Sequence, residues 1–426
     1  MSNRLRRLRR LAIVDVTPLR ASPGFRWLFV GFFFVQGGRQ LTVVAVPFQV
    51  YELTGSTLAV GLLGLAQLIP LLILSLLGGA LADAVDRRKI LVFSPLVLAL
   101  TSLGLMWNAL ADQPLIWPLF VLSAVNAGVS AIDGPARQAM VPGLVGRAML
   151  PSALALNQTL TNVAKAGFPA FGGLLIATAG LPVTFAAETA CFLVAMIFMR
   201  GIPPVAVVGG GRRLEFSSVV EGFRYLKDRR VIQAALLLDL SAMVFGMPTA
   251  LFPAIGTGVF GGDALTVGLL YAAPGVGALI GAVTSGWVGT VRRQGRAVVL
   301  AVIGWGVAIA IFGLTSSLPL ALVMLGLAGL ADVVSAIFRG AIVQLSTPDE
   351  LRGRVTSMHM AVVAGGPRLG DLEAGAVAAL TSVRFSVVSG GVACILAAVA
   401  ISRWAPAFVR YVPELEENGQ SGDVAR

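Results

Sequence analysis

The sequence predicts an all-α membrane protein whose twelve transmembrane helices form two pseudo-symmetric six-helix bundles. Three observations predict this fold: an apolar composition, a series of apolar runs of bilayer length, and an internal repeat. Of the 426 residues, 57% are apolar and only 12% are charged, and the mean hydropathy is +0.87. A soluble domain of this length does not need so much apolar sequence, so the composition excludes a soluble globular protein.

The apolar residues gather in runs of about 20, the length with which a helix crosses a bilayer. The predicted spans are 27–50, 58–80, 90–111, 115–137, 150–177, 182–200, 231–255, 265–289, 297–316, 319–340, 355–381 and 384–404. The predicted domains are a basic cytoplasmic N-terminal arm at 1–26, a six-helix bundle at 27–200, a cytoplasmic linker at 201–230, a second six-helix bundle at 231–404 and a polar cytoplasmic tail at 405–426. Within the linker, the pattern Ser218-Val-Val-Glu221 resembles a capping box and predicts a short amphipathic surface helix.

Three short sequences of the first half recur in the same order in the second half. They are 60–63 with 267–270, 129–132 with 334–337, and 167–172 with 365–370. Such a parallel repeat predicts a duplicated bundle. In transporters built this way, the substrate site lies between the repeats near the middle of the membrane.

The loop charges predict the orientation. Arginine and lysine are frequent in the arm 1–26 and in alternate loops, whereas the opposite loops contain Glu52, Asp112, Asp263 and the single base Arg384. Basic loops stay in the cytoplasm, so both termini are expected there. The net charge of +11 therefore follows from membrane orientation and does not indicate a nucleic-acid partner.

Several classes of site are not predicted. Cys191 and Cys394 both fall within predicted spans, and His359 is the single histidine, so no metal cluster or histidine relay is expected. The sequence offers neither a nucleophile–base pair nor a phosphate-binding Gly-x-x-x-x-Gly-Lys-(Ser/Thr) loop, so we expect no enzyme, no ATP-driven pump and no cofactor.

The connection between the second and third spans is short and carries five ionisable residues within 79–91. It resembles the signature loop of the major facilitator superfamily, Gly-x-x-x-Asp-(Arg/Lys)-x-Gly-(Arg/Lys)-(Arg/Lys). The matching residues are Gly79, Asp83, Arg87 and Arg88, while Ala84 and Asp86 depart from the pattern. The resemblance implies a cytoplasmic gate, in which Arg137 at the end of the fourth span is expected to pair with Asp83. The alternative is an ordinary basic loop.

Ionisable side chains within the predicted spans cost free energy in lipid, so each is expected to have a partner or a function. They are Arg39, Asp133, Lys165, Glu188, Asp239, Asp332, Arg339, Arg368, Asp371 and Glu373. In the facilitator fold, every one of them except Glu188 falls on a helix at the cavity side. Arg368 and Asp371 lie three apart and are expected to pair, which leaves Glu373 as a better candidate for a free acid. We expect these residues to bind protons or substrate; the alternative for each is a structural ion pair.

The fifth span resembles the Gly-Pro-x-x-Gly-Gly signature of facilitator antiporters. Pro169, Gly172 and Gly173 match it, while Phe168 replaces the first glycine. A proline in a helix frees a carbonyl and favours a kink, and glycines permit close approach. The alternative is a packing kink of the kind found in any membrane helix.

Within the superfamily, the chain is most similar to the bacterial enterobactin-exporter type. The stretches that carry this resemblance are 44–47, 60–62, 79–89, 347–354 and Gly370-Asp371. It implies a proton-driven exporter of siderophores or amphipathic drugs in the bacterial inner membrane, with lipid, a small-molecule substrate and protons as partners, and a monomeric state. An uptake symporter, a lipid flippase and a non-transporting receptor or scaffold remain alternatives.

Overall fold

The computed structural model describes residues 15–84, 86–204, 226–227 and 229–412, and every regular element among them is helical. The first half contains α2 (Thr17–Ala21), α3 (Pro23–Thr54), α4 (Thr57–Ala84), α5 (Arg87–Leu110) and α6 (Trp117–Arg200). The second half contains α8 (Arg230–Phe245), η1 (Thr249–Leu251), α9 (Phe252–Ala254), η2 (Ile255–Val259), α10 (Ala264–Val283), η3 (Ser285–Thr290), α11 (Gln294–Leu314), α12 (Leu318–Leu345), α13 (Asp349–Leu380), α14 (Val383–Trp404) and α15 (Pro406–Val409). The predicted linker helix and most of the N-terminal arm lie outside the described residues.

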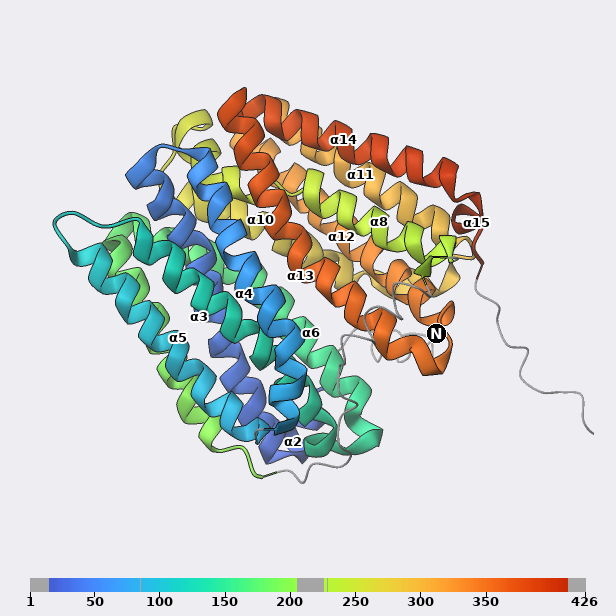
Figure 1. The fold of residues 1–426 in the computed structure, drawn as a ribbon, viewed down its shortest axis with the longest axis horizontal. Coiled ribbons are helices and arrows are strands. Elements are labelled where there is room, and N and C mark those ends of the chain that lie inside the picture. Colours follow the sequence, from blue (N-terminus) through green and yellow to red (C-terminus); the bar gives the residue numbers. More distant parts are fainter. Residues whose placement is uncertain (1–14, 85, 205–225, 228, 413–426) are drawn as a thin grey trace, which may run out of the picture.

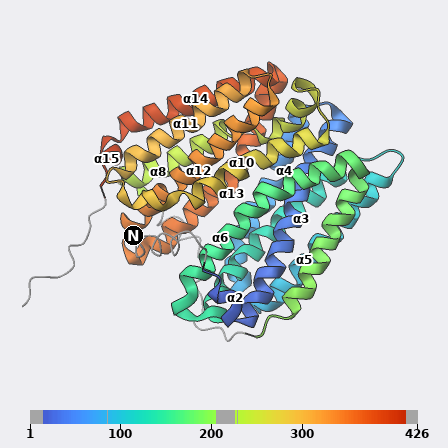
Figure 2. The same cartoon turned by 180° about the vertical axis from the view of Figure 1, so that it is seen from behind.

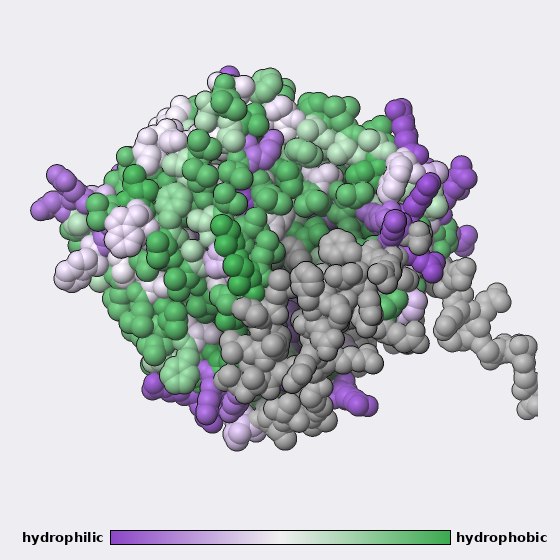
Figure 3. Space-filling model, viewed as in Figure 1, coloured by the Kyte–Doolittle hydropathy of each residue, from purple (hydrophilic) through white to green (hydrophobic). Residues whose placement is uncertain are grey.

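The helices form two groups that lie side by side (Figures 1 and 2). One apolar cluster lies wholly within the first half, between Phe25 and Ile202, and another wholly within the second, between Leu226 and Phe408. A third cluster combines side chains of α3, α4, α5 and α6 with Ala264 and Val267 of α10. Each half therefore has its own core, and a smaller shared core joins them. Green apolar side chains cover much of the outer surface in Figure 3, as contact with lipid requires.

Among the described residues, nine helical stretches are long and apolar enough to cross a membrane. One of them, α6, is 84 residues long and covers three predicted spans. It is broken where Gly146 and Gly180 adopt φ values of 73° and 85°, a region that glycine enters without steric cost. The 32-residue α13, which carries three of the ionisable residues, is not among the nine. The total of twelve spans therefore stays a prediction.

The predicted span 231–255 lies within the candidate membrane span Arg230–Val259, but its helix is interrupted after Phe245. Pro248 lacks an N–H and cannot continue the α8 hydrogen bonds. The backbone groups that the break exposes are paired with side chains of neighbouring helices: the indole Nε1 of Trp305 donates to the carbonyl of Gly246 at 2.7 Å, and the hydroxyl of Tyr271 donates to that of Thr249 at 2.9 Å. Irregular backbone is tolerated inside a membrane protein only when it is satisfied in this way.

Glycines permit close contact between the halves. A Cβ placed on Gly173 of α6 would lie 2.5 Å from the carbonyl oxygen of Ala264, and one on Gly61 of α4 would lie 2.7 Å from that of Asp371. Along α4, these contacts between the halves extend from its N-terminal end to Leu68, whose side chain would contact a Cβ placed on Gly365 of α13. Toward the other end of α4, the two halves draw apart (Figure 1).

The packing of α10 against α12 provides a stability test. An added Cβ on Gly277 would collide with the carbonyl oxygen of Gly326, whereas one on Gly326 would meet only the carbonyl of Ala273, at 3.7 Å. We expect Gly277→Ala to destabilise the protein by about 1–3 kcal/mol through overpacking. Gly326→Ala should be neutral or slightly stabilising, because alanine has the higher helix propensity. Thermal unfolding in detergent measures both, and equal melting temperatures for the two variants would contradict this packing.

Candidate functional site

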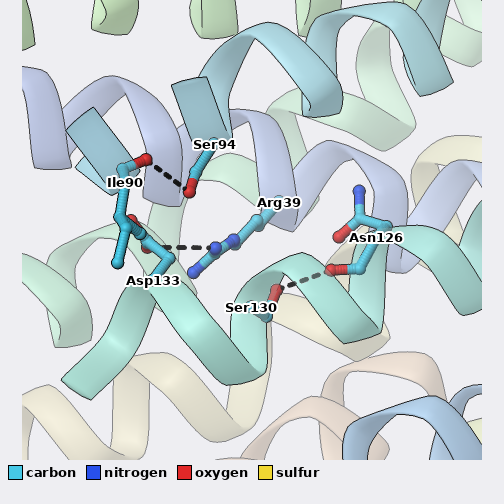
Figure 4. A network of polar contacts seen from close by, with 6 residues as sticks. All are labelled: Arg39, Ile90, Ser94, Asn126, Ser130 and Asp133. Carbon is cyan, nitrogen blue, oxygen red and sulfur yellow. Dashed lines mark hydrogen bonds and ion pairs between the residues drawn. The ribbon is translucent and has the colours of Figure 1, made fainter. Parts of the chain in front are cut away.

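A buried ion pair connects α3 and α6 in the first half (Figure 4). Nη2 of Arg39 lies 3.2 Å from Oδ2 of Asp133, and the two side chains are 18% and 4% exposed. Ser94 and Ser130, drawn beside the pair, donate their hydroxyls to backbone carbonyls of their own helices. The Asp133 carboxylate thus pairs with Arg39, and Arg137 also interacts with it electrostatically.

Arg137 lies one helical turn after Asp133. The Cζ atom of its guanidinium is 3.6 Å from the centre of the Phe32 ring, which is a cation–π geometry. The predicted partner of Arg137, Asp83, belongs to α4, but its side chain lies outside the described residues. The predicted gate pair therefore stays a prediction.

The signature-loop residues occupy two helices instead of a loop. Gly79 and Asp83 belong to the last turns of α4, and Arg87 and Arg88 to the first turn of α5. Asp86, which replaces the glycine of the family pattern, is the N-cap of α5 and accepts from the N–H of Arg88 at 2.9 Å. The departure from the pattern thus has a local structural reason.

A second charge cluster lies in the other half, around the fully buried Asp239 of α8. Its Oδ1 is 2.8 Å from Nη2 of Arg339 on α12, and its Oδ2 is 3.4 Å from Nε2 of His359 on α13. Nη1 of Arg339 also donates to the hydroxyl of Ser335 at 2.9 Å. A carboxylate with no exposed surface thus contacts basic groups from two other helices.

Asp332 extends this cluster toward the first half. It interacts electrostatically with Arg339 and Asp239, and also with Lys165 of α6. The α6 backbone is close to α10 at this level, since a Cβ on Gly275 would lie 2.5 Å from the carbonyl carbon of Lys165. The side chain of Lys165 is exposed. The cluster therefore includes charges from both halves.

His359 is not among the site residues predicted from the sequence, because a lone histidine predicts neither a metal site nor a relay. It lies within the predicted span 355–381, so the criterion that selected the other ionisable residues applied to it as well. Its contact with Asp239 depends on how α13 packs against α8, which the sequence does not reveal.

Asp371 of α13 binds the broken part of the helix that α8 begins. Its Oδ1 accepts from the hydroxyl of Thr249 and, at 3.0 Å, from the N–H of Ala250. Its Oδ2 lies 3.7 Å from Nη1 of Arg368, so the structure brings the expected pair together. The carboxylate caps the segment that begins at Thr249, as an N-cap residue would, but it comes from another helix.

Two further acids differ in their surroundings. Glu373 is half-buried, and no basic side chain in the described part of the chain forms an ion pair with it. Glu188 is fully buried, and its Oε1 accepts from the hydroxyl of Thr42 at 2.5 Å. Its Oε2 has no hydrogen-bond partner in the described structure. Thr42 is a contact that sequence reasoning missed.

The antiporter-like sequence of α6 packs against α10. Pro169 is buried, and its carbonyl oxygen would lie 2.6 Å from a Cβ on Gly268. Gly172 approaches Leu41 of α3, and Gly173 approaches α10. The non-helical positions within α6 are Gly146 and Gly180, so Pro169 itself does not interrupt the helix.

Chemically, this arrangement places carboxylates and bases on facing helices and on both sides of the interface between the halves, and several of them, such as Asp133, Asp239 and Arg339, are buried. In such surroundings the energy of each charge depends strongly on its partner. A proton, or a charged group of a substrate, that occupies one member of a pair frees the other. No group of His, Cys, Asp and Glu side chains among the described residues has the composition of a metal site.

Comparisons with known proteins identify the family of this chain. Residues 14–420 match the family described as "Transmembrane secretion effector". The enterobactin exporter EntS of Shigella boydii serotype 18 is 28% identical over 393 residues, which are 91% of this chain and 93% of that protein. The same exporter from Escherichia coli O139:H28 has the same identity and coverage.

Solved structures show the same fold at low sequence identity. The nucleoside transporter NupG is similar with a TM-score of 0.68 and 12% identity, over 91% of this chain and 100% of that one. A bacterial homologue of the iron transporter ferroportin in an inward-facing state is similar with a TM-score of 0.67 and 17% identity, over 90% of this chain and 98% of that one. The chain therefore belongs to the transmembrane secretion effectors of the major facilitator superfamily and is a multi-pass membrane transporter similar to the enterobactin exporters.

Proposed function

We propose that this transporter exports a siderophore-like or amphipathic small molecule by alternating access, coupled to the entry of protons. The observation that most supports the proposal is the buried cluster around Asp239. It combines Arg339 and Asp332 of one half with Lys165 of the other. When one of two charges that attract each other across the interface is neutralised, the attraction is lost, and the relative position of the halves can change.

The proposed coupling is a competition for buried carboxylates. A carboxylate removed from water can bind a proton, and a neighbouring arginine favours the anion instead. Proton binding and substrate binding at the same group then exclude one another. The residues proposed for coupling or substrate binding are Arg39, Asp133, Lys165, Asp239, Asp332, Arg339, Arg368, Asp371 and Glu373.

The proposed motion is a rocking of the bundles 27–200 and 231–404 about their glycine contacts. With both termini in the cytoplasm of a bacterial cell, the closed end of the interface faces outward, and the present conformation faces inward. The cytoplasmic gate would consist of Gly79, Asp83, Arg87, Arg88 and Arg137, and the packing of Pro169, Gly172 and Gly173 would carry the motion. The working unit is proposed to be a monomer.

Transport by purified protein in liposomes tests the function. Enterobactin and the amphipathic cation ethidium serve as probes, and a pH jump imposes the proton gradient. Export predicts that at least one probe moves against the direction of proton flow. Movement with the protons would instead identify a symporter. A matched liposome without protein gives the leak rate.

The Asp239–Arg339 pair predicts different effects of single and double variants. Asp239→Asn removes the carboxylate that lies 2.8 Å from the buried Arg339 guanidinium, which we expect to cost about 3–5 kcal/mol of stability. The double variant Asp239→Asn/Arg339→Met removes both charges and should recover most of that loss, while proton-driven transport stays absent. Thermal unfolding and the liposome assay separate the two effects. Normal proton-driven transport by the double variant would remove this pair from the mechanism.

Asp371 has a structural and an electrical role that two variants distinguish. Asp371→Asn keeps the Oδ1 acceptor for Thr249 and Ala250, whereas Asp371→Ala leaves both donors unsatisfied and should cost about 1–3 kcal/mol. We expect the asparagine variant to fold but to lose its response to the pH gradient. If both variants transport with wild-type coupling, Asp371 is only a structural cap.

The gate proposal predicts that Asp83→Asn slows transport at least tenfold while the protein is inserted and folded normally. The matched control is Asp86→Asn, since asparagine is as good an N-cap as aspartate. Initial rates in liposomes, normalised to the amount of reconstituted protein, measure both variants. Similar rates for the two would argue against a special role of Asp83.

A further inference from the structure

The Asp239 carboxylate has a base on each oxygen. Arg339 lies 2.8 Å from Oδ1, and the imidazole Nε2 of His359 lies 3.4 Å from Oδ2. The side chain of Asp239 is fully buried, that of Arg339 is 3% exposed and that of His359 is 19% exposed. Nε2 itself is buried and has no hydrogen-bond partner in the described structure. The imidazole is therefore aimed at a carboxylate without forming a complete hydrogen bond to it.

The charges of this cluster do not balance without a further positive group. Within this cluster, Asp239 and Asp332 contribute two negative charges, and Arg339 contributes one positive charge. One negative charge remains, and a surplus charge in a low-dielectric interior is costly. Two groups can balance it: the ammonium of Lys165, which interacts electrostatically with Asp332 from the first half, or a proton on His359.

We propose that His359 is a proton-binding residue of this cluster, and that its protonation replaces Lys165 as the second positive charge. When His359 is neutral, the cluster attracts Lys165, and the halves are held together at this level. When His359 is protonated, the cluster is already balanced, and the attraction to Lys165 falls. Proton binding within one half thus loosens its contact with the other.

Among the side chains that the structure describes, the charged groups that face this site come from four helices. They are Asp239 on α8, Asp332 and Arg339 on α12, Lys165 on α6 and His359 itself on α13. Histidine is suited to this role because its charge changes near physiological pH. It is also the single histidine of the chain, so a substitution at this position removes all imidazole chemistry from the protein.

The inference rests on the proposed coupling role of the cluster, but its test needs no substrate. Nitroxide labels on cysteines at positions 147 and 345 report the separation of the halves at their predicted cytoplasmic ends, since Arg147 and Leu345 are both exposed. Cys191 and Cys394 are first replaced by alanine. Pulsed electron paramagnetic resonance on the full-length protein in nanodiscs then gives the distance distribution between pH 5.5 and 8.5.

We expect the wild-type distribution to change with pH. His359→Gln should keep the high-pH distribution throughout, and His359→Arg should keep the low-pH one. Lys165→Gln should give the low-pH distribution at every pH, because the cluster then has no ammonium group to attract across the interface. Lys227→Gln, which removes an exposed lysine elsewhere in the chain, is the matched control and should leave the midpoint unchanged.

A wild-type distribution that does not respond to pH, or a His359→Gln variant that responds normally, would overturn the inference. A normal pH response in Lys165→Gln would also overturn it, and this variant keeps the test valid should His359→Arg fail to fold. Failure of the proposed function alone would give a different result. The distances would still change with pH in a way that requires His359, but a proton gradient would drive neither probe across the liposome membrane.

Discussion

A buried charge inside a membrane protein must have a partner, and much of this structure serves that requirement. Asp239 has no contact with solvent, and Arg339 lies 2.8 Å from it. The pair fixes α8 against α12, and His359 adds α13 to the same contact. In the first half, Arg39 and Asp133 connect α3 with α6 in the same way. Removal of one partner would leave the other charge uncompensated, so each pair constrains the helices that supply it.

The broken helix after α8 follows the same rule for uncharged groups. Three helices provide the side chains that satisfy its exposed backbone: Tyr271 from α10, Trp305 from α11 and Asp371 from α13. The break therefore has a defined shape. The break also connects the charged segment of α13 with the part of the chain near the shared apolar core. A change at Asp371 would therefore affect both the α13 segment and that part of the chain.

The interface between the halves combines two kinds of contact. Glycines such as Gly61 and Gly173 bring backbones together at the closed end, and these contacts do not depend on pH. Nearer the middle, Lys165 and Asp332 interact through their charges. Under the proposed mechanism, proton binding weakens that attraction, so a contact that depends on pH lies next to contacts that do not.

The sequence by itself determined the membrane class, the helical architecture, the family and most of the ionisable residues within the spans. It could do so because hydropathy, loop charge and helical spacing are local properties of the chain. Arg368 with Asp371, three residues apart on one helix, was predicted for that reason. Only the tertiary structure decided which residues of different helices meet. It brought His359 and Arg339 into contact with Asp239, Thr249 into contact with Asp371, and Thr42 into contact with Glu188. Those contacts depend on the rotation and depth of helices far apart in the sequence, and such quantities leave no periodic signal in a single chain.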